Sequence, residues 1–102
     1  MKSYKQFFHG KNLRKSDRQH KPIKWYPNSY IDTYNAETGK FRSRRKFGKS
    51  GWVSKDMDTA DEHRPFDHIH DWHGKRRERV PRFPNRQERA EFKKAKKKRR
   101  FL

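Results

Sequence analysis

Apolar and polar positions alternate most clearly in the middle of the chain, where they predict short β-strands. Tyr30, Asp32 and Tyr34 fall on one face of an extended segment, with β-favouring Ile31 and Thr33 on the other. Turns containing Gly39, Gly48 and Gly51 separate this segment from two more. The pattern predicts a meander of antiparallel strands within residues 25–34, 41–47 and 52–58.

Residues 67–73 alternate in the same way and predict a fourth strand. Side chains two residues apart share a face of a strand, so His68, His70 and Trp72 lie on one face and Ile69 lies on the other. Two imidazole rings are therefore expected side by side.

The C-terminal part predicts one helix after a linker broken by Pro81 and Pro84. Asn85 followed three residues later by Glu88 is typical of a helix N-terminus, and the helix is expected over about residues 86–100. The predicted fold class is α+β, with a small antiparallel sheet of three or four strands, a basic N-terminal arm and a C-terminal basic helix. The predicted divisions are a basic arm at 1–24, a β-rich domain at 25–74 and a basic linker and helix at 75–102.

Charge then dominates the functional interpretation. The chain has 102 residues with 30 Lys and Arg against 12 Asp and Glu, which gives a formal net charge of +18. Such a chain is stabilised by a polyanion, since phosphate contacts relieve self-repulsion and release counterions. The 15% aromatic content supplies rings that stack on unpaired bases, which favours RNA. The predicted phosphate-binding cations are Arg42, Arg44, Arg45, Lys46, Arg76, Arg77, Lys93, Lys94, Lys96, Lys97 and Lys98.

The sequence does not indicate a membrane-spanning or secreted protein. No apolar run is long enough to span a bilayer, and the N-terminal residues lack the apolar segment of a secretory signal. A cytoplasmic location without membrane contact is therefore expected. The chain has no cysteine, which excludes disulfides and thiolate zinc sites.

Residues 55–73 depart from the basic average. Lys55 and Arg64 are the only strong cations there, against six acids, and four of the six histidines of the chain lie in this segment. One interpretation is that the acids neutralise nearby Lys and Arg side chains. The other is a reactive centre inside a cationic binding surface.

A reactive centre of this composition suits RNA cleavage without a metal. A base removes the proton of the ribose 2′-OH, an acid protonates the leaving oxygen, and a cation stabilises the charge at phosphorus. Histidine titrates near neutral pH and serves both proton transfers. The candidates for proton transfer are His68 and His70 with Asp56 or Asp58, and the candidate clamps are Arg64 and Lys55.

Two metal-dependent alternatives stay open. His68 and His70 form a chelating pair that Asp56, Asp58 or His63 completes for Zn²⁺ or another divalent ion. The run Asp67-His68-Ile69 also resembles the start of the motif of HNH nucleases, for which Asn85 is the candidate asparagine. No histidine follows His73, so that motif is incomplete.

The order of rare residues between positions 30 and 73 supports one of these interpretations. A Tyr-rich hairpin precedes Asp56-x-Asp58-Thr59-x-Asp61, then Arg64-Pro65 and His68-x-His70-x-Trp72. This order resembles the C-terminal domains of bacterial polymorphic toxins, which also occur attached to phage head proteins. The resemblance implies a ribonuclease-like toxin domain, and a toxin requires a neutralising partner, which is expected to be acidic.

The leading hypothesis is therefore an RNA-binding, toxin-type ribonuclease without a cofactor, in which the histidines act as acid and base. The alternative is a non-catalytic nucleic-acid-binding protein of a phage, a mobile element or a ribosome-associated complex. In that case the acidic segment is structural or binds a partner.

Overall fold

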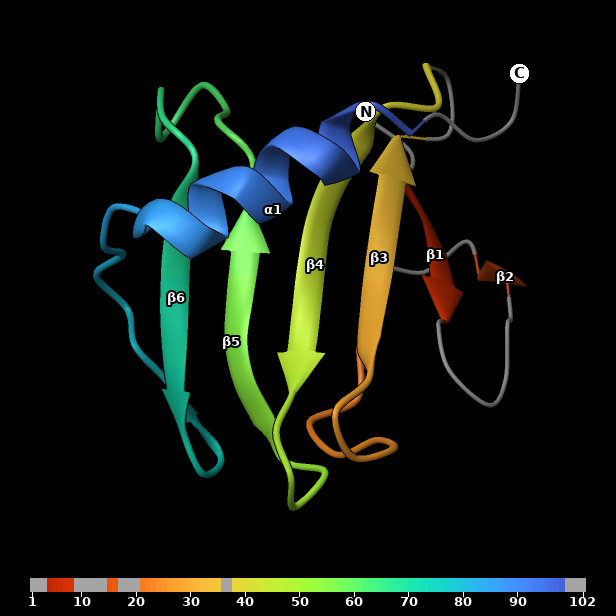
Figure 1. Cartoon of the computed structure of the whole chain (residues 1–102), viewed down its shortest axis with the longest axis vertical. Coiled ribbons are helices and arrows are strands. Elements are labelled where there is room, and N and C mark those ends of the chain that lie inside the picture. The colour runs from red at the N-terminus through yellow and green to blue at the C-terminus, as the bar shows by residue number, and fades with distance from the viewer. Residues whose placement is uncertain (1–3, 9–14, 17–20, 36–37, 99–102) are drawn as a thin grey trace.

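The computed structural model describes residues 4–8, 15–16, 21–35 and 38–98 and consists of one antiparallel sheet with one helix across it (Figure 1). The strand order is β2-β1-β3-β4-β5-β6-β7, and every neighbouring pair is antiparallel. The strands are β1 Tyr4–Phe8, β2 Lys15–Ser16, β3 Tyr30–Asn35, β4 Phe41–Phe47, β5 Val53–Asp58, β6 His68–His73 and β7 Arg76–Arg77.

The α+β class, the meander β3-β4-β5 and the fourth predicted strand β6 are confirmed. The sheet continues beyond the predicted strands, because β1 pairs with β3 along five residues and the short strands β2 and β7 cap the two edges. Part of the predicted basic arm is thus sheet. The remainder of residues 1–20 lies outside the described residues.

The helix α1 Arg86–Lys96 begins with the expected cap. The Asn85 side chain accepts a hydrogen bond from the Glu88 amide, and the Glu88 carboxylate accepts one from the Asn85 amide. The helix ends at Lys96, earlier than expected, since the next four residues of the sequence, 97–100, are all Lys or Arg and supply no apolar position for another turn.

The helix lies on one face of the sheet and closes the larger of two apolar clusters (Figure 1). Phe92 and Ala95 are buried there against the sheet. The sheet contributes Tyr34, Phe41, Met57 and Ile69. Because Met57 and Ile69 face the helix, the alternate residues of β5 and β6 face the other side of the sheet.

The second cluster lies on that opposite face and brings in residues 21–25. The Ile23 carbonyl accepts a hydrogen bond from Val53, and the Trp25 amide donates to Gly51. Gly51 has φ +85°, and a Cβ atom there would approach the Trp25 carbonyl oxygen to 2.6 Å. The turn therefore requires glycine, and residues 21–25 belong to the folded unit.

Candidate functional site

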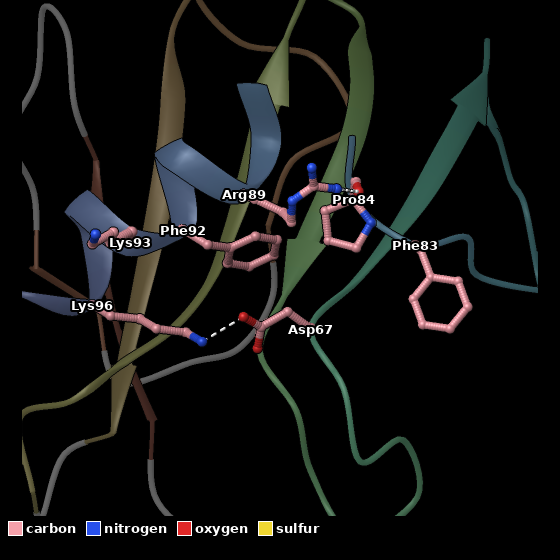
Figure 2. Close-up of a pocket in the computed structure, with 7 residues that line it drawn as sticks. All are labelled: Asp67, Phe83, Pro84, Arg89, Phe92, Lys93 and Lys96. Carbon is pink, nitrogen blue, oxygen red and sulfur yellow. Dashed lines mark hydrogen bonds and ion pairs between the residues drawn. The ribbon is translucent and has the colours of Figure 1, made fainter. Parts of the chain in front are cut away.

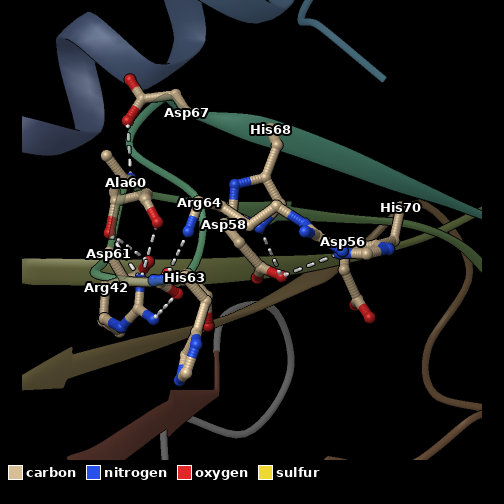
Figure 3. A network of polar contacts seen from close by, with 12 residues as sticks. Arg42, Asp56, Asp58, Ala60, Asp61, His63, Arg64, Asp67, His68 and His70 are labelled. Carbon is tan, nitrogen blue, oxygen red and sulfur yellow. Dashed lines mark hydrogen bonds and ion pairs between the residues drawn. The ribbon is translucent and has the colours of Figure 1, made fainter. Parts of the chain in front are cut away.

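The pairing of β5 with β6 builds the centre that the sequence predicts. Asp58 lies opposite His68, and Asp56 lies opposite His70. All four side chains lie on the face away from α1 (Figure 3). The Oδ2 atom of Asp58 is 3.8 Å from Nε2 of His68 and 4.0 Å from Nε2 of His70. We name Asp58, His68 and His70 the Asp/His centre.

The orientation of both imidazole rings is fixed by the backbone. Nδ1 of His68 is 2.9 Å from the Phe66 carbonyl oxygen, and Nδ1 of His70 is 2.8 Å from the Glu78 carbonyl oxygen. A carbonyl oxygen only accepts, so each Nδ1 carries the proton. The Nε2 atom of each ring, which carries no proton in the neutral ring, is therefore the one that lies near Asp58.

Asp56 has a different environment from Asp58. Its carboxylate is 2% exposed and accepts two hydrogen bonds from Arg45, one from Trp72 and one from Arg77. Burial raises the pKa of Asp56, but the hydrogen bonds and charge of Arg45 outweigh it and keep the pKa below its usual value. Asp56 is therefore ionised, and both of its carboxylate oxygen atoms accept hydrogen bonds, whereas Asp58 is partly exposed.

Two cations lie beside the Asp/His centre, and the sequence assigned neither to catalysis. Nη2 of Arg77 is 3.1 Å from Oδ2 of Asp58. Nζ of Lys21 is 2.5 Å from the hydroxyl of Ser43, the residue paired with Asp58 across β4 and β5. Burial lowers the pKa of Lys21, although Asp56 and Asp58 oppose this shift. Lys21 could not be foreseen, because it lies 22 residues from its partner in an irregular segment.

Arg64, the predicted clamp, lies in the loop between β5 and β6 (Figure 3). Asp61 organises this loop by accepting hydrogen bonds from the amides of His63 and Arg64 and from the side chain of Arg42. Partial burial raises the pKa of Asp61, but these bonds outweigh it and hold the pKa at about 2. His63 and Arg64 are exposed and lie outside the Asp/His centre. Lys55 faces α1, where it binds Glu88, so it is not near the histidines.

The acids of α1 point towards the sheet and pair with its cations. Glu88 is 2% exposed and accepts hydrogen bonds from Lys55 and Arg82. Glu91 accepts hydrogen bonds from Arg44 and Lys46. The sequence identified Glu88 only as a helix cap and missed this network, because its cations come from β4, β5 and the segment between β7 and α1.

These contacts divide the predicted phosphate-binding cations into two sets. Six of them are held by acids of the protein: Arg42, Arg44, Arg45, Lys46, Arg77 and Lys96. Among the described residues, Arg76 has a single, distant acidic contact, at 4.0 Å from Glu78. Lys93, Lys94, Lys97 and Lys98 are exposed and have no acidic partner among the described residues.

A pocket of about 420 Å³ opens beside α1 and combines rings with cations (Figure 2). Phe92 lies at its base, and Phe83 lies at its rim with 71% exposure. The Phe83 ring packs on Phe66 with 4.6 Å between centroids. Polar groups are supplied by Arg89, Lys93, Lys96 and Asp67. This pocket could not be predicted from the sequence, because Phe83 lies between Pro81 and Pro84 in a segment without periodicity.

Comparison with known protein families, with curated proteins and with solved structures finds no match for this chain. In the part of the chain that the structure describes, no helix has the length and apolar character needed to cross a membrane.

Proposed function

We propose that this protein binds single-stranded RNA through the outward face of α1 and the pocket beside it. The observation that carries this proposal is the segregation of charge on the helix. Its acids Glu88 and Glu91 face the sheet, while the cations of the opposite side face solvent. We name this side the outer cationic face; it comprises Arg86, Arg89, Lys93, Lys94 and Lys97.

The internal pairing of acids leaves this face without a counter-charge from the described part of the chain. Nine of the ten acids in the described residues form an ion pair with a Lys, Arg or His, and the exception is Glu62. The cations of the outer cationic face therefore gain most from external phosphates. Each phosphate contact also releases counterions, which adds free energy that depends on salt.

The pocket favours a single strand over a duplex. Phe83 presents an exposed ring next to Arg89 and Lys93, so a strand whose phosphates lie on the helix can place an unpaired base on the ring. Stacking of a base on an aromatic side chain contributes about 1–3 kcal/mol and needs no particular base. Paired bases are not accessible in this way.

Binding of fluorescent oligonucleotides tests this function. Single-stranded RNA is expected to bind with strong salt dependence, and duplex DNA of equal length is expected to bind more weakly. Phe83→Ala is expected to weaken RNA binding by about 1–3 kcal/mol while leaving duplex binding unchanged. Equal affinity for both nucleic acids in the wild type and in Phe83→Ala would contradict the single-strand proposal.

A second candidate function, RNA cleavage, is favoured by the convergence of two Nε2 atoms on Asp58. One neutral imidazole would take the 2′-OH proton while that oxygen attacks phosphorus. The other, protonated, would give its proton to the leaving 5′ oxygen, so that a 2′,3′-cyclic phosphate and a free 5′-OH result. Arg77 would stabilise the charge on the phosphorus oxygens.

Phe66 links the two candidate regions at the edge of β6. Its ring contacts Phe83 of the pocket and lies edge-on to His68 of the Asp/His centre, with 6.0 Å between centroids.

Cleavage is tested by end-group analysis of labelled RNA with and without EDTA. A cyclic phosphate that forms in EDTA and is lost in His68→Ala would support the candidate, and intact RNA in every condition would reject it.

A further inference from the structure

His68 and His70 are buried histidines with one nitrogen atom each left for a ligand. They are 3% and 6% exposed, and both Nδ1 atoms are held by backbone carbonyls. In metalloproteins the imidazole that binds a metal usually donates its other N–H to a carbonyl or carboxylate, which fixes the ring and makes it a better ligand. Both rings already have this arrangement.

The three remaining ligand atoms lie around one point. Nε2 of His68, Nε2 of His70 and a carboxylate oxygen of Asp58 are all within 4.8 Å of one another. Ligands about 2.0–2.1 Å from a tetrahedral zinc ion lie about 3.4 Å apart. The two distances to Oδ2 of Asp58, 3.8 and 4.0 Å, exceed that spacing by roughly half an ångström, which side-chain rotation accommodates.

We propose that Asp58, His68 and His70 form a binding site for a divalent transition metal, with Zn²⁺ as the preferred ion. Two imidazoles and one carboxylate match the ligand preference of zinc and its neighbours, whereas Mg²⁺ and Ca²⁺ prefer oxygen atoms alone. Three protein ligands leave the fourth tetrahedral position for water. The three ligands lie on the face away from α1, and none of them belongs to the RNA-binding surface proposed above.

Arg77 controls access to this site. It comes from the two-residue edge strand β7, is 40% exposed, and binds both Asp56 and Asp58. Entry of a metal requires its Nη2 atom to leave Oδ2 of Asp58, while its Nε bond to Asp56 can remain. Removing this charge is therefore expected to increase metal affinity.

A metal on both Nε2 atoms also excludes their use in proton transfer. The cleavage described as a second candidate thus belongs to the metal-free protein, and zinc is expected to inhibit it. Metal binding itself is measured without RNA, so the failure of either proposal leaves the other standing.

The test is titration of the EDTA-treated full chain with Zn²⁺ by calorimetry, and with Co²⁺ by visible absorption. We expect one tight site per chain and no competition from Mg²⁺. Loss of a group that hydrogen-bonds a metal-binding side chain weakens metal binding by about 10–100-fold. Loss of a metal ligand in His70→Ala is expected to weaken the affinity at least as much. His73→Ala, which changes an exposed histidine paired with Glu78, is the matched control and should bind as the wild type does.

Two measurements keep the test decisive if His70→Ala does not fold. In the wild type, Zn²⁺ should shift the imidazole NMR signals of His68 and His70 and leave that of His63 in place. Arg77→Gln should bind Zn²⁺ more tightly than the wild type by several-fold. Equal perturbation of all histidines, or equal binding by His70→Ala and His73→Ala, would overturn the proposal.

Discussion

Arg44 on β4 donates a hydrogen bond of 2.8 Å from Nη1 to Oε2 of Glu91 on α1. The same guanidinium also binds Asp32 through Nε and Nη2, and it is 7% exposed. This arginine therefore joins the sheet to the helix instead of facing a ligand.

Replacing Arg44 is expected to reduce stability without removing a phosphate contact. Arg44→Met removes two charge-assisted hydrogen bonds from the buried carboxylate of Asp32, so the free energy of unfolding should fall by about 3–5 kcal/mol. Urea denaturation checks this. RNA affinity, measured where the variant is folded, should stay within about twofold of the wild type. A variant of unchanged stability that has lost RNA binding would contradict this role.

Glu88 makes the fold sensitive to acid. Burial raises the pKa of Glu88, but the hydrogen bonds from Arg82 and Lys55 outweigh it and lower the pKa from its ordinary value of 4.5 to about 2. The unfolded chain thus binds more protons between these values, and the stabilisation is complete above about pH 4.5 and lost as the pH falls towards 2.

The variant that tests this pH dependence is Glu88→Gln. We expect it to be less stable than the wild type at pH 7 by about 2 kcal/mol, since it loses charge-assisted hydrogen bonds, and to lose less stability between pH 5 and pH 2. Denaturant midpoints at a series of pH values measure both effects. Parallel pH profiles for the two proteins would show that Glu88 is not the responsible carboxyl.

The turn at Gly51 gives a separate test of the fold. Gly51→Ala places a Cβ atom in a left-handed backbone conformation and against the Trp25 carbonyl oxygen. The expected loss of stability is about 1–3 kcal/mol. Gly74→Ala is the control, because Gly74 also has positive φ, at 64°, but an added Cβ atom meets nothing within 4 Å. A smaller loss for Gly51→Ala than for Gly74→Ala would contradict the close contact with residues 21–25.

The sequence predicts the faces of the strands but not their register. Alternation alone places His68 and His70 on one side of a strand, and the structure confirms this. Whether His68 lies opposite Asp58 depends on the pairing of β5 with β6, and the loop between them is too long and irregular to fix that pairing from local pattern.

The sequence also does not predict which Lys and Arg side chains are paired inside the fold and which are exposed. Arg44 and Lys93 are both basic residues in basic segments, and only the packing of α1 on the sheet separates a buried ion pair from an exposed charge. Charge patterns along a chain describe its partners in general terms, whereas the ion pairs of Arg44 and Lys46 with Glu91 join residues 47 and 45 positions apart.

The central claim is that RNA binds the outer cationic face of α1. The most direct measurement compares the salt dependence of RNA affinity for Lys93→Gln/Lys94→Gln with that for Lys49→Gln/Lys75→Gln, which has the same net charge. Lys49 and Lys75 lie in turns at the end of the sheet away from the helix (Figure 1). The slope of log affinity against log salt changes by about 0.7 for each phosphate contact with a single strand. The helix variant should therefore lose about 1.4 of the slope, and the turn variant should keep the wild-type value; equal slopes for the two variants would contradict the claim.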